Sequence, residues 1–157
     1  MTSKSVYIKT FLVLLLLIWC AGIFSPVLFR TAQSKLFSDL YLPRIYSLVC
    51  HREDSKSFFV EGNKLEVCAR CTGIYAGALL FSIVALVRKI RPRTKKLLYA
   101  AFVLMAADVL SYSIGIYSYS KWIALITGLI LGSVSILYIF DGIEEYFSEL
   151  KMSPDVQ

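Results

Sequence analysis

The run WIALITGLILGSVSILYIF, residues 122–140, has 19 residues and no charged side chain. A helix rises about 1.5 Å per residue, so a run of this length nearly spans the roughly 30 Å hydrocarbon core of a bilayer. Hydrophobic residues make up 57% of the chain and charged residues 18%, which is too apolar for a globule surrounded by water. The run therefore predicts a membrane-spanning helix.

Three similar apolar runs precede this one. Together the four runs predict transmembrane helices at about residues 8–29, 72–88, 97–117 and 122–140. The first run is longer than the core of a typical signal peptide and no clear small-residue cleavage site follows it, so we expect it to be retained. The predicted fold is an all-α membrane protein, a four-transmembrane-helix bundle that forms a single integral membrane domain over residues 1–157.

A polar loop, residues 30–71, separates the first two predicted helices. Apolar residues at near-helical spacing between residues 40 and 49 predict a short helix that lies on the membrane surface. Residues 57–60 (SFFV) and 65–67 (LEV) are mostly apolar and flank a turn that contains glycine, which predicts a β-hairpin leading into the second helix.

The connection between the second and third predicted helices is strongly basic. Residues 88–96 hold six Lys or Arg side chains among nine residues. The positive-inside rule places this connection, and with it both termini, in the cytoplasm, so the loop of residues 30–71 is predicted to be extracytoplasmic. Because the basic residues concentrate in this connection, the net charge of +6 indicates the orientation of the chain in the membrane. We expect the lipid bilayer as partner and no nucleic acid.

Three of the four cysteines and the single histidine lie in the polar loop, as Cys50, His51, Cys68 and Cys71. Three thiolates and one imidazole complete a tetrahedral set for zinc or another divalent transition metal. Gly73 follows closely and suits the tight backbone of such a knuckle. Cys20 stands apart in the first predicted helix, where cysteine usually serves as a small hydrophobic residue.

The same residues also support a redox hypothesis. Cys68 and Cys71 begin a predicted helix with Arg70 between them, and a helix N-terminus and a nearby cation both favour thiolates. In an oxidising compartment these two cysteines would form a disulfide, with His51 as proton carrier and Cys50 as resolving thiol. A purely structural disulfide with a spare thiol is the simplest alternative. The sequence leaves metal binding and dithiol chemistry open.

An acidic residue interrupts the third predicted helix. Asp108 lies about eleven residues into it, and an ionisable group at such a depth is costly and predicts a function or a buried partner. It suggests a proton-carrying residue of a small transporter or a buried hydrogen-bond acceptor for a neighbouring helix; the simpler alternative is a hydrogen bond to a hydroxyl of its own helix, such as that of Ser111.

Small residues four apart mark one face on each of two predicted helices. They occur as Gly73-x-x-x-Gly77 in the second, and as Ala124-x-x-x-Gly128-x-x-x-Gly132 in the fourth. Such faces allow close helix contact, so they predict a compact bundle or a homo-oligomer formed through them.

These motifs together resemble a known family. The quoted pattern is Cys50-His51-Arg52, Ser57-Phe58, Cys68-Ala69-Arg70-Cys71-Thr72-Gly73-Ile74-Tyr75, Asp108 and Thr127-Gly128. It is similar, over roughly residues 50–132, to small prokaryotic membrane proteins grouped as domain of unknown function 2085. Members often carry a glutamine after the Cys-His pair and an arginine before the Ser-Phe pair, where this chain has Arg52 and Lys56.

The resemblance implies a multi-pass protein of a prokaryotic inner (cytoplasmic) membrane with a shared site at the cysteines, supported by Arg70, Gly73 and Asp108. It implies no reaction. The sequence also lacks a phosphate loop, a nucleophile elbow and a Rossmann glycine pattern, so no enzyme class and no small-molecule substrate is assigned.

Overall fold

The computed structural model describes residues 3–28, 41–51, 53–60, 62–88, 90, 92 and 94–152. Four long helices dominate it, namely α1 (Ser3–Ile23), α5 (Ala69–Val87), α6 (Lys96–Ser113) and α7 (Lys121–Met152). Each contains a stretch long and apolar enough to cross a membrane, which confirms the predicted four-helix membrane fold. Large apolar side chains stay exposed along α1, α5 and α6, where a bilayer would cover them.

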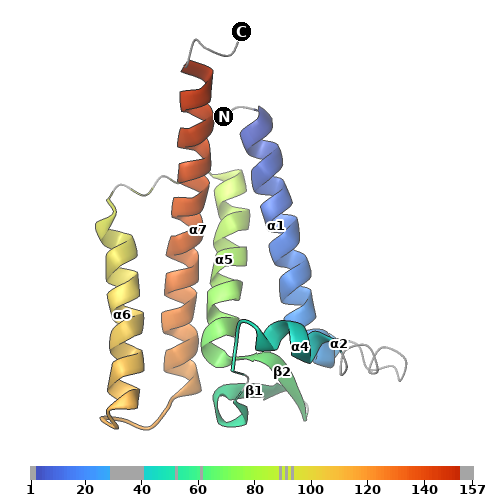
Figure 1. Ribbon diagram of the computed structural model, residues 1–157, viewed down its shortest axis with the longest axis vertical. Helices are drawn as coiled ribbons and strands as arrows, with labels where there is room; N and C mark the ends of the chain where they lie inside the picture. The colour runs from blue at the N-terminus through green and yellow to red at the C-terminus, as the bar shows by residue number, and fades with distance from the viewer. Residues whose placement is uncertain are drawn as a thin grey trace.

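Several helix ends differ from the prediction, and the first helix, predicted at about residues 8–29, is Ser3–Ile23 in the structure. The third helix ends at Ser113 instead of residue 117, because Gly115 adopts a left-handed φ of 80° that a helix cannot continue through. The fourth helix runs on to Met152, twelve residues beyond its predicted end at residue 140. Figure 1 shows that the last turns of α7 extend beyond the rest of the bundle.

A buried ion pair helps to explain the extension of α7. The Lys9 ammonium of α1 lies 2.7 Å from the Glu144 carboxylate of α7, and both side chains are largely buried. Lys9 also lies over the Phe140 ring, 5.3 Å from its centroid. These contacts join the start of α1 to α7 beyond residue 140, at the end of the bundle where both termini are found (Figure 1).

The short elements gather at the opposite end of the bundle (Figure 1). They are α2 (Ser25–Leu28), α4 (Leu42–Ser47), the 3-10 helix η1 (Asp54–Lys56), and strands β1 (Ser57–Val60) and β2 (Asn63–Cys68). The strands are antiparallel, with Ser57 opposite Cys68 and Val60 opposite Asn63. Gly62, with φ of 80°, supplies the turn. The predicted short helix and β-hairpin are therefore confirmed, whereas residues 30–40 of the loop lie outside the described part of the chain.

The two glycine-bearing faces pack against each other within the chain. A methyl group on Gly73 or Gly77 of α5 would meet a backbone oxygen of α7 at 2.2 or 2.3 Å. A methyl group on Gly128 or Gly132 of α7 would meet a backbone oxygen of α5 at 2.3 or 2.0 Å. These glycines bring the backbones of α5 and α7 into direct contact. They are therefore used inside the molecule, as the predicted compact bundle requires, and a homo-oligomer stays a prediction.

The core lies where α1, α5 and α7 meet, and α6 lies outside it. One cluster of buried side chains comprises Val13, Ala85, Ile136, Leu137 and Phe140. Among the described residues of α6, only Ala101 and Asp108 are buried. Helix α6 packs along α7, on the far side from α1 (Figure 1). It is therefore the least embedded of the four long helices.

Candidate metal centre

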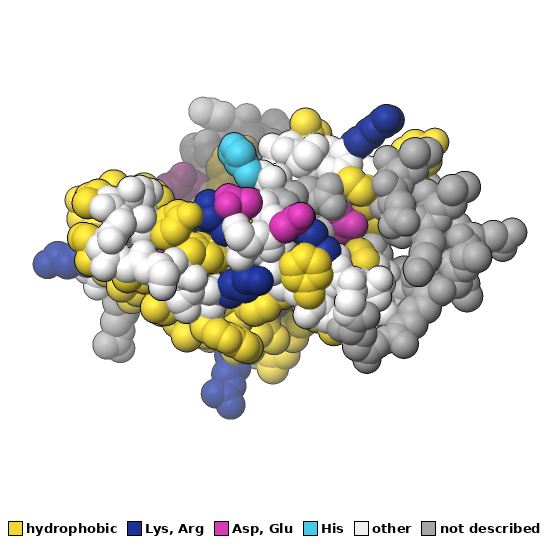
Figure 2. Space-filling view, turned by 90° about the horizontal axis from the view of Figure 1, so that it is seen from below, with side chains coloured by type: hydrophobic (Ala, Val, Ile, Leu, Met, Phe, Trp, Pro, Cys, Tyr) yellow, Lys and Arg dark blue, Asp and Glu magenta, His cyan; other side chains and the backbone are white. Residues whose placement is uncertain are grey.

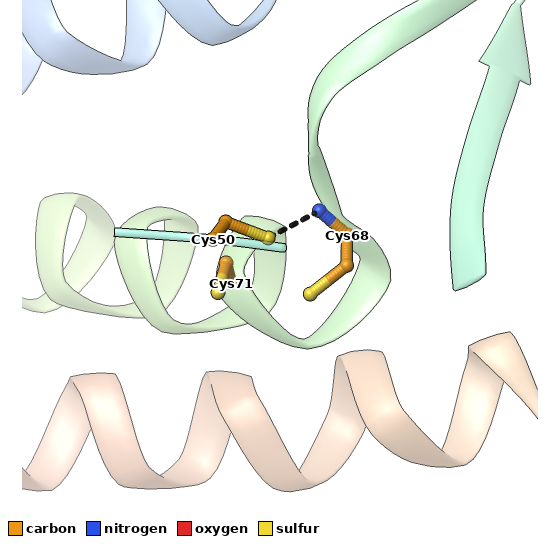
Figure 3. A group of neighbouring side chains, drawn as sticks. All are labelled: Cys50, Cys68 and Cys71. Atoms are coloured by element: carbon orange, nitrogen blue, oxygen red, sulfur yellow. Dashed lines mark hydrogen bonds between the residues drawn. The ribbon is translucent and has the colours of Figure 1, made fainter. Parts of the chain in front are cut away.

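Three cysteine side chains converge at the N-terminal end of α5. The Sγ atoms of Cys50, Cys68 and Cys71 all lie within 4.8 Å of one another, and Figure 3 shows the three side chains gathered around one point. The Cys68 backbone N–H donates a hydrogen bond to Cys50 Sγ over 3.2 Å. Zinc–sulfur bonds of about 2.3 Å in a tetrahedron place sulfurs about 3.8 Å apart, so the cluster is close to a ligand geometry.

The hairpin and α5 position two of these cysteines. Cys68 ends β2 and is also the N-cap of α5, with an extended ψ of 163°. Cys71 follows in the first helical turn, because the helix starts at Ala69. Both cysteines thus lie at the N-terminal end of α5, where the helix dipole would offset part of the negative charge of metal-bound thiolates.

Helix α4 positions the third cysteine. The Cys50 backbone N–H donates to the Tyr46 carbonyl over 2.9 Å. Tyr46 is 2% exposed, and its hydroxyl donates to the Trp19 carbonyl of α1 over 2.8 Å. Gly22 makes room for that hydroxyl, since a methyl group there would lie 2.2 Å from it. Burial raises the pKa of Tyr46 to about 12, so this residue stays a neutral donor and ties Cys50 to the first transmembrane helix.

A cavity of about 300 Å³ borders the sulfurs. His51, Glu53, Lys56 and Arg70 line its other walls. His51 is exposed and its ring lies outside the three-sulfur group, so the structure brings it to the same cavity but not into the cluster. Figure 2 shows the single histidine among charged side chains on this end of the molecule. Arg52, noted as a departure from the family pattern, lies outside the described residues.

Asp108 is joined to the cysteine cluster through Arg70. Because α6 ends at Ser113, Asp108 lies five residues before the end of the helix and faces the cysteine end, not the middle of the bundle. Its carboxylate lies 2.5 Å from the Arg70 guanidinium, and the Tyr117 hydroxyl donates to its second oxygen. The suggested hydrogen bond to Ser111 is therefore wrong. Asp108 instead forms an ion pair with a residue of another helix.

Lys56 makes a second connection between this cavity and α6. Its ammonium lies 5.0 Å from the Tyr112 ring centroid and 5.8 Å from that of Tyr119. It also lies 2.6 Å from the exposed Glu53 carboxylate. The hydrogen bond to Glu53 raises the pKa of Lys56, and the same bond lowers the pKa of Glu53. Both groups are therefore charged at neutral pH.

The tyrosines of this end were missed by the sequence reasoning. Tyr112, Tyr117 and Tyr119 lie within eight residues around the link between α6 and α7, and that density of aromatic residues next to a span was the available signal. Of the two roles predicted for Gly73, the close helix contact is confirmed and the turn of the knuckle is not. Gly73 lies inside α5 and permits contact with Leu125 of α7, while the turn of the knuckle is the helix start itself.

Cys20 lies apart from the cluster. It is buried in α1, and its Sγ lies 3.7 Å from the Tyr75 carbonyl of α5, a weak hydrogen bond. All four cysteines are free thiols in the structure. Only three of them therefore have neighbouring sulfurs with which to bind a common metal ion.

Fold and site together define a multi-pass membrane protein with a three-cysteine cluster built on the end of one of its membrane-spanning helices. Residues 50–138 match the family described as "Predicted membrane protein (DUF2085)". The chain belongs to this family. The matched region contains all three clustered cysteines as well as Arg70 and Asp108.

Two archaeal proteins are similar to the chain. An uncharacterized protein of Methanocaldococcus jannaschii is 35% identical over 134 residues, which cover 83% of this chain and 85% of that protein. An uncharacterized protein of Methanothermobacter thermautotrophicus is 40% identical over 40 residues, 26% of this chain and 36% of that protein. No solved structure matches the chain. Both relatives are named only as uncharacterized, so they assign no activity to this chain.

Proposed function

We propose that the protein binds a divalent transition metal, with zinc as the first candidate, through Cys50, Cys68 and Cys71. The observation that carries this proposal is the convergence of three sulfurs within 4.8 Å from two segments distant in the sequence. Three thiolates this close repel one another unless a cation lies between them. A thiophilic divalent ion offsets that repulsion and suits the donor set.

The fourth ligand is proposed to be His51 or a water molecule in the cavity. His51 lines the cavity next to the sulfurs, so a change in the loop around it would bring an imidazole nitrogen to the ion. Four protein ligands would make the site closed and structural, whereas a water ligand would leave one position open. The role we propose is accordingly structural or sensory, and it assigns no reaction to the protein.

The decisive measurement is the metal content of the detergent-purified protein, prepared under reducing conditions. We expect about one metal ion per chain in the wild type and loss of that ion in Cys68→Ser and Cys50→Ser. Cys20→Ser is the matched control, because it removes a buried thiol that lies outside the cluster. A wild type without metal, or a metal content unchanged in Cys68→Ser and Cys50→Ser, would refute the proposal.

His51→Ala separates the two forms of the site. A fourth protein ligand predicts a large loss of affinity, whereas a water ligand predicts near-normal affinity together with binding of an added anion to the open position. Cobalt substitution reports the difference directly, because its d–d absorption changes with the ligand set.

The second candidate is a membrane thiol–disulfide protein. It is favoured by the position of Cys68 as N-cap and Cys71 in the first turn of α5, where the helix dipole favours thiolates. In this reaction one thiolate attacks the disulfide of a partner, and the other thiolate then displaces the partner as a dithiol. Metal-free protein in which these two cysteines cycle between alkylatable and protected forms would support this candidate against the metal site.

A third hypothesis, a small transporter that uses Asp108 as a proton carrier, is less well supported. The carboxylate is engaged by the Arg70 guanidinium and by the Tyr117 hydroxyl. Both carboxylate oxygens are therefore already engaged by groups of the same chain, which agrees with a role in joining the helices. Transport activity that is lost in Asp108→Asn while the metal content stays normal would support the transporter hypothesis.

We propose that the cysteine cluster faces the outside of the cytoplasmic membrane of a prokaryotic cell and that the chain forms a single membrane domain. The support is the basic connection of residues 88–96, because the end of α5 before it and the start of α6 after it lie at the opposite end of the bundle from the short elements (Figure 1). Reporter fusions placed after residue 152 and within the loop of residues 30–40 test the orientation. A cytoplasmic signal from the loop fusion would reverse it.

A further inference from the structure

We infer that Arg70 and Asp108 form a positioning pair that couples metal binding at the three cysteines to the placement of α6. The inference rests on the metal site proposed above. Arg70 lies between Cys68 and Cys71 in sequence, and its guanidinium reaches the Asp108 carboxylate of α6 at 2.5 Å. The ion pair therefore starts inside the metal-binding turn and ends on another helix.

The pair is built into the interior. The side chain of Asp108 is 5% exposed and that of Arg70 is 18% exposed, so water competes little for either group. The Tyr117 hydroxyl, from the segment after α6, donates to the second carboxylate oxygen. The carboxylate is thus fixed from two directions, which gives it one orientation toward Arg70.

Helix α6 has few other attachments to the site. Among its described residues only Ala101 and Asp108 are buried, and it packs along α7 at the edge of the bundle. The other connection is Lys56, whose ammonium lies near the Tyr112 and Tyr119 rings. Both Arg70 and Lys56 also line the cavity beside the sulfurs. The walls of the cavity and the end of α6 are therefore held by the same two side chains.

Metal binding would act on this arrangement through the backbone. An ion held by Cys68 and Cys71 fixes the turn between them and with it the starting point of the Arg70 side chain. The planar guanidinium then presents its donors to Asp108 in a defined direction. Thermodynamic linkage makes this coupling reciprocal. If metal binding stabilises the placement of α6, then the same placement of α6 raises the affinity for the metal.

Charge gives the direction of the effect. Asp108 offsets the positive charge of Arg70, which stands next to the sulfurs that receive a divalent cation. Asp108→Asn removes that offset and the anchor together, and both changes disfavour the metal. Loss of a supporting partner of this kind weakens metal binding by about 10- to 100-fold.

The test compares the wild type, Asp108→Asn and Tyr117→Phe in detergent. Tyr117→Phe removes one donor to the carboxylate without changing any charge, so it keeps the test open if Asp108→Asn does not fold. Metal affinity is measured by competition with a chelator, and the geometry of the site by the absorption of the cobalt form. Hydrogen exchange of residues 109–120, with and without zinc, reports the order of the end of α6.

The matched control is Glu144→Gln, which breaks the ion pair with Lys9 at the opposite end of the bundle. We expect zinc to slow exchange in residues 109–120 of the wild type. We expect Asp108→Asn to bind zinc about 10- to 100-fold more weakly, with altered cobalt bands and no zinc effect on exchange. Tyr117→Phe should show the same changes to a smaller degree, and Glu144→Gln should match the wild type in zinc affinity, cobalt bands and the zinc effect on exchange.

Normal affinity, unchanged cobalt bands and unchanged exchange in Asp108→Asn or in Tyr117→Phe would overturn the inference, and the pair would then be only a structural attachment. That result leaves the metal site in place, because the wild type would still bind zinc through its cysteines. A wild type that binds no metal would instead remove the proposed function and this inference with it.

Discussion

Gly128→Ala tests whether the contact between α5 and α7 sets the cysteine site. Gly128 faces the metal-binding turn directly, because a methyl group there would lie 2.3 Å from the backbone oxygen of Arg70. Arg70 belongs to the segment between Cys68 and Cys71. One added carbon therefore presses on the backbone that carries two of the three proposed ligands.

The magnitude follows from that distance. Ordinary van der Waals contact begins at 3.4 Å, so the two helices must separate locally by about 1 Å. Overpacking of this kind costs about 1–3 kcal/mol of folding free energy, and a gap of up to 1 Å forfeits about a quarter to a half of the dispersion energy of the contacts around it. Metal–ligand distances tolerate changes of only about 0.2 Å, so we expect the affinity for zinc to fall as well.

The assay has two readouts in detergent: the midpoint of thermal unfolding and the affinity for zinc. A loss of about 2 kcal/mol lowers the unfolding temperature of a chain of this size by about 4–8 °C. Gly142→Ala is the matched control on the same helix, since nothing lies within 4 Å of a methyl group there. It should be neutral or up to about 1 kcal/mol more stable, because alanine favours a helix over glycine.

The reasoning is refuted if Gly128→Ala is as stable as Gly142→Ala and binds zinc with the affinity of the wild type. A loss of stability with normal zinc affinity would confirm that the contact between α5 and α7 stabilises the fold. It would contradict the claim that this contact sets the positions of the metal ligands.

Three further predictions concern other parts of the molecule. Tyr46→Phe, which loses the bond to the Trp19 carbonyl, should cost about 0.5–1.5 kcal/mol by thermal unfolding. Because its pKa is raised from 10.0 to about 12 in the folded protein, the contribution of Tyr46 is complete below pH 10 and lost as pH rises toward 12, so Tyr46→Phe should show a smaller alkaline loss of stability than the wild type. Lys9→Met should cost about 3 kcal/mol because it removes the buried ammonium that lies 2.7 Å from the Glu144 carboxylate, and adding Glu144→Gln should recover most of it; equal stability of both variants would contradict a buried pair. A chelator should expose the three clustered cysteines to a thiol reagent while Cys20 stays protected until unfolding, and labelling that ignores the chelator would count against the metal.

The helices and their count could be predicted because each is a local property of composition. An uncharged run of about 20 apolar residues has few stable solutions other than a membrane-spanning helix. The ends were less predictable. The end of α6 depends on Gly115, and the extension of α7 depends on an ion pair between Glu144 and Lys9, which lie 135 residues apart.

The candidate site was predictable in its members and not in its arrangement. The spacing of Cys68 and Cys71 and the position of Cys50 pointed to a shared site, because few cysteines occur elsewhere in the chain. His51 was assigned by chemistry alone, and the structure leaves it on the cavity wall. A neighbour in sequence does not share a ligand position unless the backbone turns between the two residues.

The sequence by itself determined that the protein is a bundle of four membrane-spanning helices with a hairpin and a cysteine-rich loop, since hydrophobic length, turn residues and ligand type are local properties. Only the tertiary structure decided that the glycine faces meet each other inside the chain and that Asp108 forms an ion pair with Arg70. These are pairings across dozens of residues, and the choice among possible partners depends on which helices stand next to one another. That neighbourhood is set by packing, and no single segment encodes it.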